Sequence, residues 1–322
     1  MKTCTTTLLA VIAALLLGQA AHAQTYPTRA VRVIVPYAAG GNTDFTARAI
    51  GAKLTEIWKQ QILVDNRPGG GTNIGSELAA QAAPDGYTLF MGGASNAINM
   101  TLYAKPPYDT LRDFAPVVWC VQGAAILATH PSLPVTNLKE LIALAKSRPG
   151  QLNFGSAGLG SSNHMAGELL KMMANVNIVH VPYKGNTPSI TDTIAGNVEM
   201  VFSGVPALIP HMKSGRLRGL AISSLERFPA VPDVPTFDES GVKGYETSNW
   251  FGLMAQSKVP AEIIRRVNAD VNKVLAGGDV REKFDKSGLI TKGGTTEEFD
   301  RFIRSEIEKY RKVIQVAGVK PL

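Results

Sequence analysis

The stretch 31–44 joins a strand, a double-glycine turn and a helix start, and it restricts the fold more than any other part of the chain. Residues 31–35 are apolar apart from one arginine and rich in β-branched side chains, which predicts a buried strand. Pro36 ends it, because proline cannot donate to a central ladder. Gly40 and Gly41 permit a sharp turn that leaves backbone N–H groups uncovered. A strand that turns directly into a helix is typical of an α/β protein.

The helix after this turn begins with Asn42, Thr43 and Asp44, which all favour helix N-termini. Its unpaired N–H groups and the positive end of its dipole provide a place for an anion. No Lys or Arg occurs between residues 36 and 47, so a carboxylate would be held there by backbone and not by a salt bridge. A glycine turn required only for packing would give the same pattern, and the stretch alone leaves both interpretations open.

A second glycine loop, residues 155–164, has the same character. Its glycines free the backbone N–H groups, Ser156, Ser161 and Ser162 add hydroxyl donors, and an apolar helix face follows at once. His164 stands at this helix start, where it either packs locally or touches a ligand. With one such loop in each half of the chain, we expect both to meet at one ligand.

Strand-like and helix-like stretches alternate along the chain, which predicts parallel sheets with helices on both faces. In such sheets ligands bind beyond the carboxyl ends of the strands, where both loops lie. A length of 322 residues favours about two domains. The expected strands after the first are 62–65, 88–91, 117–121, 125–128, 152–154, 178–181, 198–202, 217–222 and 247–255.

Three further residues follow or lie within expected strands, where they could line a cleft between the two sheets. Lys184 could add a charge beside an anion, although a solvated loop lysine is the simpler interpretation. Ser203 could donate to a ligand. Trp250 could form a wall of the cleft, but a buried hinge tryptophan fits the pattern equally well.

Other site chemistries fail on spacing. Neither Ser156 nor Ser161 lies in a Gly-x-Ser-x-Gly elbow, no Gly-x-x-x-x-Gly-Lys-Ser/Thr phosphate loop occurs, and the five histidines have no metal-ligand spacing. The net charge of +7 comes from scattered basic residues, without a run that favours nucleic acid. We therefore expect no cofactor, no metal and no nucleic-acid partner.

Residues 1–23 have the features of a secretory signal peptide: a positive start, an apolar run at 8–17 and a small-x-small cleavage site ending at Ala23. We expect cleavage after Ala23 and a soluble periplasmic protein. Cys4 leaves with this segment, so Cys120 is alone and is expected to be buried and inert.

A set of motifs that runs in order through the chain is similar to the Bug-type extracytoplasmic receptors of tripartite tricarboxylate transporters. The motifs are residues 26–27, 35–44, 64–71, 84–89, 153–164, 181–185, 215–221, 232–236 and 250–252. The resemblance implies a two-domain Venus-flytrap fold with two chain crossovers and a ligand cleft between the domains. It also implies that the two glycine loops pinch one carboxylate, partly through water, and that a membrane permease docks the receptor.

The resemblance and the residues together predict domain 1 at 24–123 plus 247–322, domain 2 at 124–246, and hinges near residues 122–123 and 249–250. The sequence departs from the usual pattern at Asn42, where relatives have a small residue or proline, and at Ser203, where many have Asp. The missing acid argues against a ligand amino group there. The candidate ligand-binding residues are Tyr37, Ala38, Ala39, Gly40, Gly41, Asn42, Thr43, Asp44, Asn96, Ser156, Ala157, Gly158, Gly160, Ser161, Ser162, His164, Lys184, Ser203 and Trp250.

The leading hypothesis is a monomeric periplasmic receptor without catalytic activity, which delivers a mono- or dicarboxylate, aliphatic or aromatic, to a permease. One alternative is an exported serine hydrolase that uses Ser156 or Ser161 with His164. Another is a ligand sensor for a membrane kinase.

Overall fold

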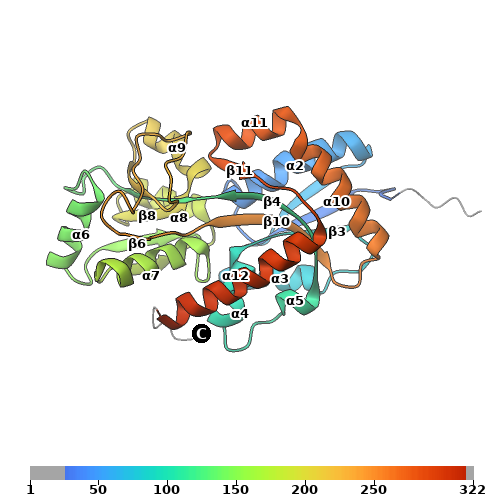
Figure 1. Cartoon of the computed structure of the whole chain (residues 1–322), viewed down its shortest axis with the longest axis horizontal. Helices are drawn as coiled ribbons and strands as arrows, with labels where there is room; N and C mark the ends of the chain where they lie inside the picture. Colours follow the sequence, from blue (N-terminus) through green and yellow to red (C-terminus); the bar gives the residue numbers. More distant parts are fainter. Residues whose placement is uncertain (1–25, 317–322) are drawn as a thin grey trace, which may run out of the picture.

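The computed structural model describes residues 26–316, which form two β-sheets flanked by helices (Figure 1). The first sheet has the strand order β11-β4-β10-β3-β1-β2 and the second β7-β6-β8-β5-β9. The first sheet contains β1 (Val31–Val35), β2 (Ile62–Asn66), β3 (Thr88–Gly93), β4 (Phe114–Gly123), β10 (Asn249–Gln256) and β11 (Leu289–Thr291). The second contains β5 (Ala125–Thr129), β6 (Asn153–Ser156), β7 (Val179–Pro182), β8 (Met200–Gly204) and β9 (Arg218–Ile222).

Both sheets are mixed, so the prediction of parallel sheets is correct only in part. β1 pairs in parallel with β2 and β3, and β6 with β7 and β8. β10 is antiparallel to β3 and β4, and β5 is antiparallel to β8 and β9. The reason is connectivity: β4 leads the chain into the second sheet and β10 brings it back, so the returning strand runs against its neighbours.

Helices cover both faces of the first sheet. On one face α2 and α10 enclose a core of β-branched strand residues such as Val33 and Val118. On the other, α4 and α12 bury Ile34, Phe90 and Met254. The helices on this side of the molecule are α2 (Asn42–Trp58), η1 (Gly70–Thr72), α3 (Asn73–Ala80), α4 (Ala94–Leu102), α5 (Thr110–Asp113), α10 (Ala261–Ala276), α11 (Gly278–Lys286) and α12 (Thr296–Val316).

The second sheet has its own two cores. Phe154 and Phe202 pack with α6 and α7 on one face, and Val201 packs with α8 and α9 on the other. Each sheet thus encloses apolar layers of its own, as expected of a separate folding unit. The helices here are α6 (Leu138–Ser147), α7 (Ser162–Ala174), α8 (Asn186–Ile194) and α9 (Val205–Lys213).

The chain passes between the sheets twice, after Gly123 and before Asn249, where β4 and β10 run through the centre of the molecule (Figure 1). Trp250 is fully buried beside the second passage and donates from Nε1 to Glu306 Oε2 of α12 at 2.9 Å. It belongs to the core that supports the crossover. Among residues 26–316, no helix combines the length and apolarity needed to cross a membrane. The expected signal peptide, with Cys4, lies outside the described residues.

Candidate functional site

The first glycine loop lies directly against the second sheet's side of the molecule. The N–H of Ala38 donates to the carbonyl oxygen of Lys184 at 3.0 Å, and Thr187 Oγ1 donates to the carbonyl oxygen of Ala39 at 2.9 Å. Gly185 has φ +150°, and a Cβ on it would lie 3.0 Å from Ala38 N. The two halves of the molecule are therefore closed on one another at this loop.

The second glycine loop reaches across in the opposite direction. A Cβ on Gly71 would lie 2.6 Å from the carbonyl oxygen of Leu159, and a Cβ on Gly160 would lie 2.1 Å from Asn99 Oδ1. Both glycines have positive φ, +61° and +70°, so glycine is needed here for conformation and for close approach. The contact closes the cleft from the other side.

A cavity of about 20 Å³ remains between the two loops. It lies where the N-termini of α2, α7 and α8 converge, so three positive dipole ends face one space. That space is enough for about one water-sized group. Its described lining carries no charged side chain and consists of Tyr37, Gly41, Asn42, Thr43, Ala157, Ser161, Ser162, Asn163, Asn186, Asn249 and Phe251.

Three asparagines bind one another along the cavity wall. Asn163 Nδ2 donates to Asn186 Oδ1 at 2.9 Å, Asn249 Nδ2 donates to Asn163 Oδ1 at 3.4 Å, and the Ser162 hydroxyl donates to Asn249 Oδ1. These residues belong to α7, α8 and β10, so the chain of hydrogen bonds links both sheets. It gives the cavity a rigid polar wall.

Sequence reasoning missed Asn163, Asn186, Asn249 and Phe251. In β10 it selected Trp250, but successive strand side chains point to opposite faces. Trp250 faces α12, so its neighbours on both sides face the cavity. Asn186 could have been found, because it follows Gly185 at an expected loop after a strand.

Asp44 serves the first loop itself. Its Oδ2 accepts from the N–H of Gly40 at 2.9 Å, and both carboxylate oxygens accept from Arg48 Nε at 3.0 Å. Burial alone would raise the pKa of Asp44, but the hydrogen bonds from Arg48 and Gly40 outweigh it and hold the pKa below its ordinary value. The hydrogen bonds of the Asp44 carboxylate thus stabilise the turn and its helix start.

The serines of the second loop also bind within it. Ser161 caps α7: its Oγ accepts from the N–H of His164 at 3.1 Å and donates to the carbonyl oxygen of Gly158 at 2.7 Å. Ser156 Oγ accepts from the N–H of Gly158 at 3.0 Å and lies 2.6 Å from His180 Nε2. The loop is therefore held in shape before any ligand arrives.

Two histidines stack beneath this loop. The rings of His164 and His180 are 4.1 Å apart between centroids, and His164 Nδ1 accepts from the N–H of Gly160 at 3.4 Å. Burial lowers the pKa of His164 to about 4 and that of His180 to about 2, so both rings are neutral at pH 7. The hydrolase alternative requires a hydrogen bond between one of the two serines and the His164 ring. Within residues 26–316, neither Ser156 nor Ser161 makes one.

The other predicted residues have different positions. Ala38, Ala39 and Gly40 contact the second sheet's side, Gly158 and Gly160 shape their loop, and Asn96 caps the N-terminus of α4 by accepting from the Gly93 N–H at 3.0 Å. Lys184 is exposed, and Ser203 is fully buried without lining the cavity. In the part of the chain that the structure describes, no three His, Cys, Asp or Glu side chains gather as metal ligands.

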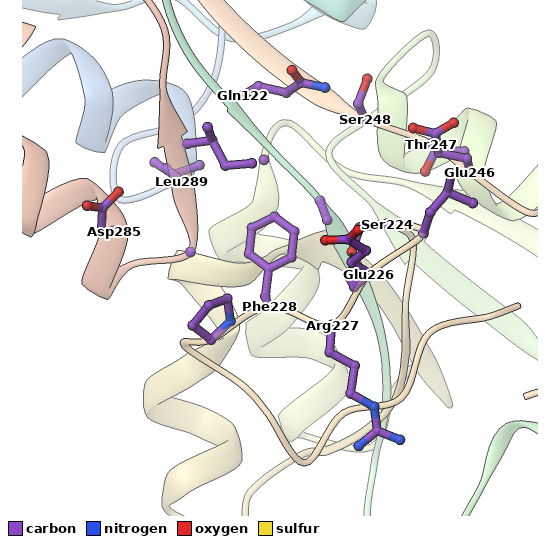
Figure 2. Close-up of a pocket in the computed structure, with 16 residues that line it drawn as sticks. Gln122, Ser224, Glu226, Arg227, Phe228, Glu246, Thr247, Ser248, Asp285 and Leu289 are labelled. Carbon is purple, nitrogen blue, oxygen red and sulfur yellow. Dashed lines mark hydrogen bonds between the residues drawn. The ribbon is translucent and has the colours of Figure 1, made fainter. Parts of the chain in front are cut away.

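A larger hollow of about 620 Å³ lies at the crossovers, away from both glycine loops. Figure 2 shows it between the loop that carries Ser224 to Phe228 and the corner that carries Asp285 and Leu289, with Phe228 directed inward and the Arg227 side chain extending away. Gln122 and Ser248 of the two crossovers also line it. Its walls come from both halves of the molecule.

Comparison with protein families matches residues 46–319 to the tripartite tricarboxylate transporter family receptor. Among similar proteins, BugT of Bordetella pertussis is 36% identical over 300 residues, covering 92% of each chain. A protein of Pseudomonas sp. strain P51, named for the tcbD-tcbE intergenic region, is 37% identical and covers 90% of this chain and 86% of its own.

Solved structures of similar fold include Rpa4515 of R. palustris with adipate, at 36% identity and a TM-score of 0.90, covering 92% of this chain and 100% of that one. MatC of Rhodopseudomonas palustris with bound malate has 30% identity and a TM-score of 0.86, with coverage of 90% and 100%. The periplasmic binding protein BugD has 28% identity and a TM-score of 0.89, with coverage of 92% and 100%. These proteins share the two-domain periplasmic-binding-protein fold.

Proposed function

The chain belongs to the tripartite tricarboxylate transporter receptor family, a family of solute-binding receptors, and we propose that it binds a small organic carboxylate between its two glycine loops. The observation that carries this proposal is the convergence of three helix N-termini, from α2, α7 and α8, on one cavity without a charged side chain in its described lining. Helix N-termini favour anions. A carboxylate in this position would be bound by backbone N–H groups and by the Thr43 hydroxyl, because the Ser162 hydroxyl already donates to Asn249 Oδ1.

The bound ligands of two similar structures support the same chemistry. Rpa4515 and MatC were solved with adipate and malate, which are both organic carboxylates. Neither ligand is transferred to this chain, because Asn42 and Ser203 stand where we expect other residues in relatives. The proposal is therefore a ligand class and not a named compound.

Binding requires the cleft to open, because the closed cavity has room for about one water-sized group. We assign residues 24–123 plus 247–322 to domain 1 and residues 124–246 to domain 2. The hinges then fall at the two crossovers beside the hollow of Figure 2. A ligand that contacts both loops shifts the equilibrium toward the closed form.

We further propose that the mature protein begins at Gln24, acts in the periplasm as a monomer without catalytic turnover, and delivers its ligand to membrane permease subunits. The signal-like residues 1–23 support export. The hydrolase alternative loses its support, because Ser156 and Ser161 are buried and neither makes a hydrogen bond to the His164 ring within the described residues.

A thermal-shift panel tests the carboxylate proposal. Each acid is paired with its neutral analogue, for example adipate with 1,6-hexanediol and benzoate with benzyl alcohol. A ligand at a hundred times its Kd should stabilise the protein by about 2.7 kcal/mol, so at least one acid should raise the melting temperature while its neutral partner does not. Stabilisation by neutral compounds or amines alone would contradict the proposal.

A further inference from the structure

The side chain of Asn42 is the one asparagine of the described cavity lining that takes no part in the hydrogen-bond chain. Asn163, Asn186 and Asn249 bind one another. Asn42 is only 2% exposed, and its Oδ1 is buried without a hydrogen-bond partner among the described residues. Leaving a buried amide unpaired costs about 1–3 kcal/mol. This side chain is therefore placed for a partner that comes from outside the protein.

The position of Asn42 depends on a glycine across the cleft. A Cβ on Gly204, at the end of β8, would lie only 1.5 Å from Asn42 Nδ2. Gly204 has φ −68°, a value open to any residue. Glycine is thus required at this position to leave space for the Asn42 side chain, and not for its backbone conformation. It leaves a notch in the second domain that the Asn42 amide of the first domain enters on closure.

We propose that Asn42 binds a hydroxyl group of the ligand, so that the receptor prefers hydroxy-carboxylates over the same acids without the hydroxyl. This inference rests on the proposed function. A hydroxyl matches the amide, because it donates to Oδ1 and accepts from Nδ2 at the same time. An ammonium group only donates, and the described lining offers it no carboxylate.

A second carboxylate fits Asn42 less well than a hydroxyl. It would accept from Nδ2 but leave Oδ1 unpaired, and burying a second charge without a cation is costly. Asn42 is also the first residue of α2, whose N-terminal N–H groups face the first carboxylate. The hydroxyl recognised here therefore lies close to that carboxylate, on the second or third carbon of the acid.

Isothermal titration with matched acid pairs measures this preference. The pairs are lactate with propionate, 3-hydroxybutyrate with butyrate, malate with succinate, and mandelate with phenylacetate. For the pairs that bind, the wild-type protein should hold the hydroxylated acid about tenfold more tightly, as one well-formed hydrogen bond allows. Equal affinity for both members of every binding pair would overturn the inference.

Two alanine variants in the same cavity separate the role of Asn42 from general damage. Asn42→Ala should bring the tenfold preference to near unity and leave affinity for the plain acid within about twofold. In the wild type, the Asn163 side chain is already hydrogen-bonded to Asn186 and Asn249. Asn163→Ala should therefore weaken the binding of both acids of a pair alike and preserve the preference. A preference that survives in Asn42→Ala refutes the assignment.

If Asn42→Ala loses all binding, Asn42→Ser keeps the measurement possible, because its hydroxyl retains a donor and an acceptor. It should restore binding together with part of the preference. Restored binding without any preference counts against the inference. If no acid binds, the carboxylate proposal fails. If acids bind equally well with and without the hydroxyl, only the role of Asn42 is refuted.

Discussion

The N–H of Ala38, in the first glycine loop, donates a hydrogen bond of 3.0 Å to the carbonyl oxygen of Lys184, at the entry to α8. The contact joins a loop of the first sheet to a helix start of the second, and it brings the N-termini of α2 and α8 to the same cavity. Closure of the molecule and formation of the candidate site are therefore one event.

Gly185→Ala should hold the two domains apart. A Cβ there would lie 3.0 Å from Ala38 N and Cβ, and φ +150° is unfavourable for alanine. We expect ligand affinity to fall at least about tenfold, since each 1.4 kcal/mol corresponds to a factor of ten. Calorimetry measures the affinity, and small-angle X-ray scattering with saturating ligand should give a larger radius of gyration than for the wild type.

Gly196→Ala is the matched control for this change. Gly196 also has positive φ, +79°, but no atom lies within 4 Å of the position that its Cβ would take. It should lower stability without affecting ligand affinity. If Gly185→Ala and Gly196→Ala lose affinity equally, the loss is caused by lower stability and not by impaired domain closure.

Gly204→Ala should weaken binding through Asn42 alone. The new methyl group would collide with Asn42 Nδ2, and the backbone conformation of Gly204 suits alanine. Adding Asn42→Ala removes the colliding amide, so the double variant should bind plain acids more tightly than Gly204→Ala does. Affinities of the four proteins form a double-mutant cycle, and strictly additive losses would show that the two residues do not interact.

The stability of the protein should fall as the pH decreases from about 6.5 toward 4. Burial depresses the pKa of both stacked histidines, His164 to about 4 and His180 to about 2, with Lys171 lowering both further. The unfolded chain takes up these protons near its ordinary pKa of about 6.5, whereas the native chain does not. Stability conferred by the neutral pair is thus present above that pH and lost below it, by up to about 1.4 kcal/mol per pH unit for each ring.

Urea unfolding at pH 7 and pH 5 measures this loss. The carboxylate Oε1 of Glu168 lies 3.8 Å from His164 Nε2, and an ion pair with protonated His164 would reduce the loss of stability at that ring. The variant with both His164→Gln and His180→Gln should lose less stability between the two pH values than the wild type. Parallel losses would contradict the prediction.

Cys120 should not react with thiol reagents in the folded protein. It is fully buried in the core of the first sheet, and burial raises its pKa to about 12. In a chain expressed from Gln24 it is the one cysteine, so a chromogenic disulfide reagent at pH 8 should report no thiol until denaturant is added. Cys120→Ala should cost about 1 kcal/mol of stability and leave ligand affinity unchanged.

The sequence by itself determined the features that depend on neighbouring residues. The sequence predicts the second helix start at His164, two residues after the observed start at Ser162. The glycine turns at 40–41 and 155–164 and the helix start at Asn42 follow from conformational freedom and capping. These are local effects, and they were sufficient to predict that two donor-rich loops would exist.

Only the tertiary structure decided which side chains share the cavity. Asn249 faces it and Trp250 does not, because pairing of β10 between β3 and β4 sets which side of the strand each residue occupies. Asn163 is hydrogen-bonded, whereas Asn42 Oδ1 has no partner among residues 26–316, because residues from α7, α8 and β10 meet only after the chain has crossed twice between the sheets. Such contacts join residues far apart in the sequence, and no local pattern encodes them.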